Sequence, residues 1–270
     1  MTPQRPLILF TNDDGILSPG LWTVAEAFAD MADILIVAPI NQQSGTGRSL
    51  PSSSTGAIVP QEGKLLPAFA VDGTPAQAVQ HGIMEIATRR PDLVISGINY
   101  GENTGNGVTI SGTVGASLEA ASFGIPSIAV SQQTDHNQHL SYSKLVDFTV
   151  AAQFTRRFAE WMLGSRLPSD VDLLKLDVPM GATLDTEWRM TRLSKKRVYW
   201  PTVPDRTTSY SPQTLGYTMT LDARDAEPDS DVYAVFVDKV ISLTPISLDM
   251  TARIDLAELR TSINGSVSHM

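Results

Sequence analysis

The chain has 270 residues, 42% hydrophobic and 18% charged, which excludes wholesale disorder and predicts a folded globular protein. Its formal net charge of -9 argues against a long nucleic acid as partner, because neutralising a phosphate backbone requires a basic surface. The absence of cysteine excludes thiol catalysis, disulfides and cysteine-based zinc sites.

The N-terminal part of the chain alternates between apolar runs and helix signals. Residues 7–10 form an apolar run that predicts a buried strand. Ser-Pro at the start of residues 18–28 is typical of a helix N-terminus, with Ser as N-cap and Pro at the first helical position. Residues 34–37 predict a second buried strand. A polar loop over 41–56 follows, and then a hairpin over 57–71.

The same alternation continues to about residue 180. The expected elements are a helix over 74–86, a strand over 93–95, a helix over 113–124, a strand over 125–130, a helix over 144–163 and a strand over 173–176. We expect the last of these to be the final strand of the main sheet. Alternating strands and helices favour right-handed crossovers, so the sequence predicts an α/β fold with a mostly parallel sheet flanked by helices.

The remainder of the chain has a different pattern. Residues 189–199, 216–221 and 232–243 are predicted to be extended, and residues 255–263 to form a terminal helix. We therefore divide the chain into a core over 1–180 and a β-rich C-terminal extension over 181–270 that packs on the sheet or reaches a partner subunit.

Two adjacent carboxylates, Asp13 and Asp14, follow the first predicted strand directly. In open α/β sheets, ligands bind at the carboxyl ends of the strands. Like charges side by side are costly to bury unless a cation lies between them, and a hard divalent metal takes oxygen ligands. Asp14-Gly15 is also a common turn signal, and these residues alone would favour a turn.

Polar residues also follow the next two predicted strands. Ser44 lies in the loop after the second strand, and Asn99 lies after the third. Taken singly, each is a loop residue that bonds its own backbone. Together with Asp13 and Asp14 they form an all-oxygen set at one sheet edge, which suits Mg²⁺, Mn²⁺ or Ca²⁺ and is poor for Zn²⁺.

Ser111, Gly112 and Thr113 form a polar turn that opens a predicted helix. Unpaired N–H groups and the helix dipole make such a turn an anion site, commonly for phosphate, although an ordinary N-cap has the same pattern. Arg48 is the one cation of the second loop, and its partner is either a substrate phosphate or the acidic surface. Leu50 stands where a dinucleotide fingerprint needs its third glycine, which argues against an oxidoreductase.

The motifs jointly resemble the SurE survival-protein family. The resembling segments are 9–15 with 18–20, 38–39 with 43–45, 72–75, 96–99 with Gly101, Asn103 and Gly105, 111–114, 244–245 and 249–251. The resemblance implies a Rossmann-like sheet with a C-terminal β extension that exchanges between subunits in a homodimer or homotetramer. It also implies metal ligands at Asp13, Asp14, Ser44 and Asn99, and a phosphate-binding turn at residues 111–113.

The family resemblance implies a divalent-metal-dependent phosphomonoesterase that hydrolyses nucleoside monophosphates by metal-activated water. Asp13 and Asp14 would be the catalytic pair, Arg48 and Asn103 would contact substrate, and each subunit would bind one Mg²⁺ or Mn²⁺, with Ca²⁺ an alternative in a crystal. The expected activity is that of a 5'-nucleotidase, with 3'-nucleotidase and exopolyphosphatase activities as extensions. Attack by Asp13 or Asp14 as covalent nucleophile is an alternative, as is a non-catalytic nucleotide- or metal-binding module.

The chain departs from the family pattern at three places. Arg48 replaces a small polar residue or His, Ile110 replaces an aromatic residue, and Lys239-Val240 replaces a Gly-aromatic pair. The first two lie near the expected pocket and leave the preferred nucleotide open. No apolar run is long enough to cross a bilayer, and the N-terminus does not resemble a signal peptide, so we expect a cytoplasmic protein without a membrane partner.

Overall fold

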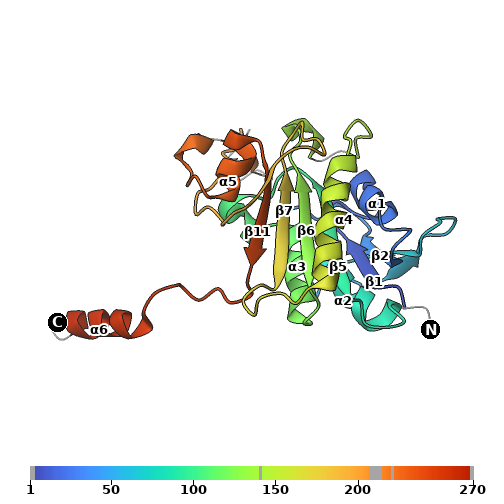
Figure 1. Cartoon of the computed structure of the whole chain (residues 1–270), viewed down its shortest axis with the longest axis horizontal. Coiled ribbons are helices and arrows are strands. Elements are labelled where there is room, and N and C mark those ends of the chain that lie inside the picture. Colours follow the sequence, from blue (N-terminus) through green and yellow to red (C-terminus); the bar gives the residue numbers. More distant parts are fainter. Residues whose placement is uncertain (1–3, 140–141, 207–214, 220–221, 268–270) are drawn as a thin grey trace.

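The computed structural model describes residues 4–139, 142–206, 215–219 and 222–267 of the chain. A central sheet lies between two layers of helices (Figure 1). In sheet order its strands are β3 (Ile58–Pro60), β4 (Ala68–Val71), β2 (Asp33–Pro39), β1 (Leu7–Thr11), β5 (Leu93–Tyr100), β6 (Ser127–Gln132), β7 (Leu173–Val178), β11 (Ile241–Ile246) and β8 (Trp188–Met190). A separate antiparallel pair consists of β9 (Tyr199–Thr202) and β10 (Gly216–Met219).

The main sheet is mostly parallel, which confirms the predicted fold class. Only the β3–β4 and β7–β11 pairs are antiparallel. The strands β1 and β7 are buried along their whole length. Both faces of a parallel sheet are covered, so its strands are expected to be continuous apolar runs, as residues 7–10 are.

Four helices cover the two faces of the sheet. Helices α1 (Pro19–Glu26) and α4 (Thr149–Gly164) pack with Phe10 and its neighbours on one face. Helices α2 (Pro75–His81) and α3 (Gly112–Ser122) pack with Leu9 on the other. The remaining helical segments are η1 (Gly82–Ile86), η2 (Gly105–Thr109), η3 (His136–Gln138), η4 (Ala223–Asp225), α5 (Asp231–Tyr233), η5 (Ala234–Asp238) and α6 (Leu256–Val267). No described helix has the length and apolar character needed to cross a bilayer.

Helix starts follow the local signals to different degrees. Thr74 accepts from the Gln77 N–H, and the Gln77 side chain accepts from the Thr74 N–H, which makes a capping box. Pro19 is the first residue of α1 as predicted, although the Ser18 hydroxyl makes no capping bond. Helix α4 begins at Thr149 rather than at 144, because Asp147 accepts the Thr149 N–H at 2.8 Å and starts the helix there.

The C-terminal part corrects two expectations. Residues 231–238 are helical as α5 and η5, so the predicted extended segment over 232–243 is wrong in its first half. The strand β7 is not the last of the main sheet, because β11 and β8 continue the sheet beyond it. The division of the chain near residue 180 stays a prediction. Residues 220–221 of the predicted segment 216–221 lie outside the described residues.

Candidate functional site

The candidate site lies where the order of the sheet reverses. The strand β1 pairs with β2 on one side and with β5 on the other, all three in parallel. The chain leaves β1 toward β2 and returns later to β5, so the carboxyl end of β1 is a topological switch point, where open α/β sheets bind ligands. Asp13 and Asp14 lie just after the end of β1, and Asn99 is the residue before the last of β5.

Asp13 is buried and is held by the N-terminus of α3. The Thr113 hydroxyl donates to Asp13 Oδ1 at 2.6 Å. Burial raises the pKa of the Asp13 carboxyl, and hydrogen bonds from Thr113 and Gly112 oppose the rise. A side chain at Gly112 would place its Cβ 2.7 Å from the Asp13 Cβ, so only glycine allows α3 to approach this carboxylate so closely.

Asp14 is equally buried, and its contacts come from three distant segments. Gln42 Nε2 donates to Asp14 Oδ1 at 3.0 Å, and the Tyr100 N–H donates to Oδ2 at 3.2 Å. The Tyr142 hydroxyl donates to the Asp14 main-chain carbonyl at 2.9 Å. Burial, and then the charge of Asp13, raise the pKa of Asp14 well above its usual value.

This pair of carboxylates fits a divalent cation. Within the described ranges, neither Asp13 nor Asp14 forms an ion pair with a Lys, Arg or His, so two adjacent buried acids lack a positive partner. A cation between them would favour the charged form of both. The described residues contain no cluster of three or more His, Cys, Asp or Glu, and hydroxyl, amide and main-chain carbonyl oxygens are the other protein ligands that such a cation takes.

The other two predicted ligands lie beside this pair. Asn99 Nδ2 donates to Gly101 O at 2.7 Å and to Tyr100 O at 3.3 Å, which occupies its nitrogen and leaves Oδ1 available as a ligand. Ser44 is exposed, and the preceding Gln43 N–H donates to the Asp13 carbonyl at 2.7 Å. The loop of Ser44 is thereby attached to Asp13. The assignment of all four residues as metal ligands stays a prediction.

The predicted phosphate turn is the start of α3. Ser111 is its N-cap, and Ser111 Oγ accepts from the Val114 N–H at 3.1 Å. The donors of Gly112 and Thr113 stabilise the charged form of Asp13. The anion that the structure places at this helix terminus is therefore Asp13, which brings the turn and the carboxylate pair together. Phosphate binding by residues 111–113 stays a prediction.

The two predicted substrate contacts have protein partners in the structure. Arg48 Nε lies 2.6 Å from the carboxylate of Glu119, a buried residue of α3. Asn103 donates through its main-chain N–H to Asp177 Oδ1 at 2.9 Å and through Nδ2 to Ser131 Oγ at 2.8 Å. Their contact with substrate stays a prediction.

Sequence reasoning missed the residues that orient Asp14. Gln42 belongs to the same loop as Ser44, and its position beside a predicted ligand was a usable signal. Tyr142 is separated from Asp14 by 128 residues, and nothing in its local sequence indicates that contact.

A buried ionic network supports the loop that follows Asn99. Lys175 Nζ bonds Asp177 and lies 3.2 Å from Asp231, and all three side chains are fully buried. Asp231 accepts from the Gly105 N–H at 2.9 Å, while Asp177 accepts from Asn103. Burial alone would lower the pKa of Lys175, but the two carboxylates raise it above its usual value. The network thus links β7 and α5 to the loop at the site.

Comparisons with known proteins agree with this geometry. The family model for survival protein SurE matches residues 8–200. The chain is 41% identical to "5'-nucleotidase SurE" of Thermococcus gammatolerans, covering 96% of each chain, and 39% identical to the protein of the same name from Methanosarcina acetivorans, covering 95% of this chain and 97% of the other. The crystal structure of the SurE protein from Aquifex aeolicus matches with a TM-score of 0.75 at 30% identity, covering 96% of this chain and 99% of that chain.

Proposed function

This chain belongs to the SurE family and is a metal-dependent nucleotide phosphomonoesterase, and we propose that Asp13 and Asp14 hold its metal. The observation that carries this proposal is the buried pair of carboxylates without a cationic partner in the described part of the chain, located at the switch point of the sheet. Ser44 and Asn99 complete the proposed ligand set.

Asp13 and Asp14 have different roles in the proposed reaction. When bound, a divalent cation supplies the charge that attracts a phosphate monoester and lowers the pKa of the attacking water. Asp13 is held by Thr113 and α3, which suits a permanent ligand. Asp14 is held by donors from other loops, Gln42 and the Tyr100 N–H, rather than by α3, and we propose that its carboxylate accepts a proton from that water.

The start of α3 is our proposed contact for the phosphoryl oxygens. Residues 111–113 lie directly against Asp13, and a helix N-terminus offers N–H donors and a positive dipole end to negative charge. We propose Asn103 as a further contact, since its loop adjoins Asn99. Arg48 would contact substrate only by exchanging part of its bond with Glu119.

The activity we expect is that of a 5'-nucleotidase, the activity named for the relatives from Thermococcus and Methanosarcina. Hydrolysis of 3'-nucleotides and of polyphosphate is included in the proposal, because the proposed metal ligands and the start of α3 contact only the phosphoryl group. The all-oxygen ligand set favours Mg²⁺ or Mn²⁺.

The test is release of phosphate from nucleoside monophosphates with Mg²⁺, with Mn²⁺ and with EDTA. We expect release only with metal, and a loss of at least about 100-fold in Asp14→Asn, since a metal contributes several kcal/mol of charge stabilisation. Glu26→Gln, an exposed acid on α1, is the matched control. Turnover of Asp14→Asn at the wild-type rate would refute the assignment. If a phospho-enzyme can be trapped, the attacking nucleophile is an aspartate and not water.

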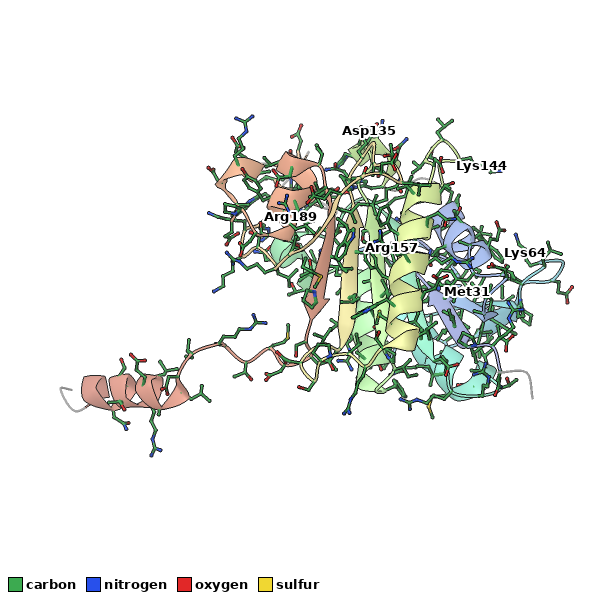
Figure 2. All side chains as sticks on the ribbon, viewed as in Figure 1. Met31, Lys64, Asp135, Lys144, Arg157 and Arg189 are labelled. Carbon is green, nitrogen blue, oxygen red and sulfur yellow. The ribbon has the colours of Figure 1, made fainter. Side chains whose placement is uncertain are left out.

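We also propose that the C-terminal segment packs against a second copy of the chain. Helix α6 projects away from the sheet, and its side chains extend into solvent on all sides (Figure 2). Every described residue from 251 to 264 is exposed. Leu256, Leu259 and Ile263 are exposed at helical spacing and form an apolar stripe that no described residue covers.

A further inference from the structure

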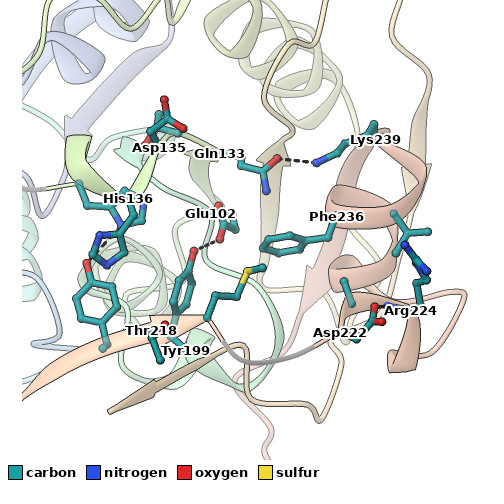
Figure 3. A pocket seen from close by; sticks show the side chains of 16 residues that line it. Glu102, Gln133, Asp135, His136, Tyr199, Thr218, Asp222, Arg224, Phe236 and Lys239 are labelled. Atoms are coloured by element: carbon teal, nitrogen blue, oxygen red, sulfur yellow. Dashed lines mark hydrogen bonds between the residues drawn. The ribbon is translucent and has the colours of Figure 1, made fainter. Parts of the chain in front are cut away.

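A cavity of about 810 Å³ is lined in part by Glu102 and His139, and Figure 3 shows it from close by. Its walls come from the loop after β5, from the loop after β6, from the β9–β10 pair and from η5. The volume is in the range of small-molecule binding sites.

One side chain separates the cavity from Asp14. Gln42 Nε2 donates both to Asp14 Oδ1 at 3.0 Å and to the carbonyl of His139 at 2.8 Å, and His139 lines the cavity. The ring of His139 also packs against Gly101, two residues after Asn99. The wall of the cavity is therefore connected to Asp14 through the single side chain of Gln42.

The cavity is rich in aromatic side chains. Tyr199 and Tyr217 meet edge to face with ring centroids 5.7 Å apart, and His136 lies 4.7 Å from Tyr217. Phe236 enters from η5 (Figure 3). A phosphatase that recognised only the phosphate would have no use for these rings, whereas flat heteroaromatic bases stack on them.

An acidic and a basic side chain, Glu102 and Lys239, also line the cavity. Tyr199 donates its hydroxyl to Glu102, a buried carboxylate, and Lys239 Nζ donates to Gln133 Oε1 at 3.2 Å (Figure 3). The cavity wall thus carries both a cationic donor, Lys239, and a carboxylate acceptor, Glu102.

Lys239 has an unusual backbone conformation for its type. Its φ of 55° is the one positive value among the described residues other than glycine. The left-handed region is unfavourable for a residue with a Cβ. Glycine would fit here without that cost, and lysine brings an exposed ammonium group to the cavity instead.

We propose that this cavity binds the base of the substrate nucleotide and prefers 6-oxopurines, guanine and hypoxanthine, over adenine. Lys239 donates to the carbonyl at position 6, Glu102 accepts the neighbouring ring N–H, and Phe236 and Tyr199 contact the ring faces. Adenine has an amino group and an unprotonated ring nitrogen at the same positions. It therefore neither accepts a hydrogen bond from Lys239 nor donates one to Glu102 there. Uracil has the same donor–acceptor edge on a smaller ring. This inference rests on the proposed function and specifies its substrate class.

The experiment compares kcat/KM for GMP, AMP and ribose 5-phosphate, the last having no base. It is run with saturating metal at about pH 8, where Glu102, whose pKa burial raises to about 7, is ionised. We expect GMP to exceed AMP by about tenfold or more, and Lys239→Met to remove that preference, since one base-edge contact is worth roughly 1–3 kcal/mol. Phe236→Ala should lower the ratio of GMP to ribose 5-phosphate by about tenfold, the loss of one stacking contact. Phe123→Ala, at the far end of α3, is the matched control.

Other results would overturn the proposed base site. Equal losses for GMP and ribose 5-phosphate in Phe236→Ala would overturn the base site, and a preference for AMP would overturn the reading of Lys239 and Glu102. If no substrate releases phosphate, the proposed function fails. Titration calorimetry with inosine then tests whether the cavity binds a base. Inosine binding that Phe236→Ala weakens supports the base site, and no binding refutes it.

Discussion

Thr113 couples the start of α3 to the carboxylate that we propose as the fixed metal ligand. Its hydroxyl donates to Asp13 Oδ1 at 2.6 Å, and both groups are buried. Thr113→Val keeps the shape and removes the donor. We expect the metal concentration for half-maximal activity to rise by about tenfold or more, since a hydrogen bond to a charged group is worth about 1.5–3 kcal/mol. The rate at saturating metal should change little.

Metal titration of the activity measures this effect. Thr155→Val is the matched control, because Thr155 is a buried threonine whose hydroxyl bonds the Ala151 carbonyl inside α4. An unchanged metal requirement in Thr113→Val would show that the hydroxyl does not support a ligand.

Glu102 makes the stability of the fold depend on pH. Burial raises its pKa from 4.5 to about 7, against the opposing bond from Tyr199. Between these values the folded protein holds a proton that the unfolded chain has lost. The contribution of Glu102 to stability is therefore complete below about pH 4.5 and is lost as pH rises to about 7.

Glu102→Gln cannot titrate, so its stability should decline less over this window than that of the wild type. Thermal unfolding from about pH 5 to pH 8 measures the difference. Parallel curves for the two proteins would mean that Glu102 titrates alike in the folded and unfolded chains. Glu258→Gln, an exposed acid on α6, is the control.

At the scale of elements, the Lys175 network joins β7 and α5 to the loop after β5. Lys175→Met leaves Asp177 and Asp231 buried without a cation, which costs about 3–5 kcal/mol in comparable cases. We expect the free energy of unfolding in urea to fall by that amount. Adding Asp177→Asn removes one stranded charge and should recover part of the loss. A double variant less stable than Lys175→Met would contradict the electrostatic account.

The elements that the sequence predicts well are those with local causes. The strand β1 is a continuous apolar run, and the acids at its end follow from residues 7–14 alone. The capping signal at Thr74 is equally local and is confirmed by its bond with Gln77. Such features need no knowledge of distant segments.

The elements that it predicts poorly depend on distant contacts. Residues 232–237 are rich in β-branched and aromatic side chains, which favours a strand. They form α5 and η5 because Ser230 caps the Tyr233 N–H, and because Asp231 is held by Gly105 and Lys175. The contacts of Gln42 and Tyr142 with Asp14 likewise span 28 and 128 residues. Tertiary contacts of this kind leave no local pattern.

At the scale of the whole molecule, α6 sets the expected assembly. A chain truncated after Ser247 loses the apolar stripe of Leu256, Leu259 and Ile263 but keeps every strand of the main sheet. We expect the full chain to form a dimer or tetramer and the truncated chain to be smaller. Light scattering coupled to gel filtration measures both masses. Leu259→Glu should act like the truncation, while Glu258→Gln should not. Equal masses for all chains would refute the role of α6.

Helix α6 also has a consequence for the lifetime of the protein. A free helix of 12 residues is marginal in water, and the residues of this one from Leu256 to residue 264 are all exposed. In a dilute solution of single copies, the segment from 247 to 264 is therefore the place where a protease cuts first. Once a second copy covers it, the same peptide bonds are protected. Resistance to limited proteolysis should therefore rise with protein concentration, and the tail would mark unassembled copies for removal while assembled ones persist.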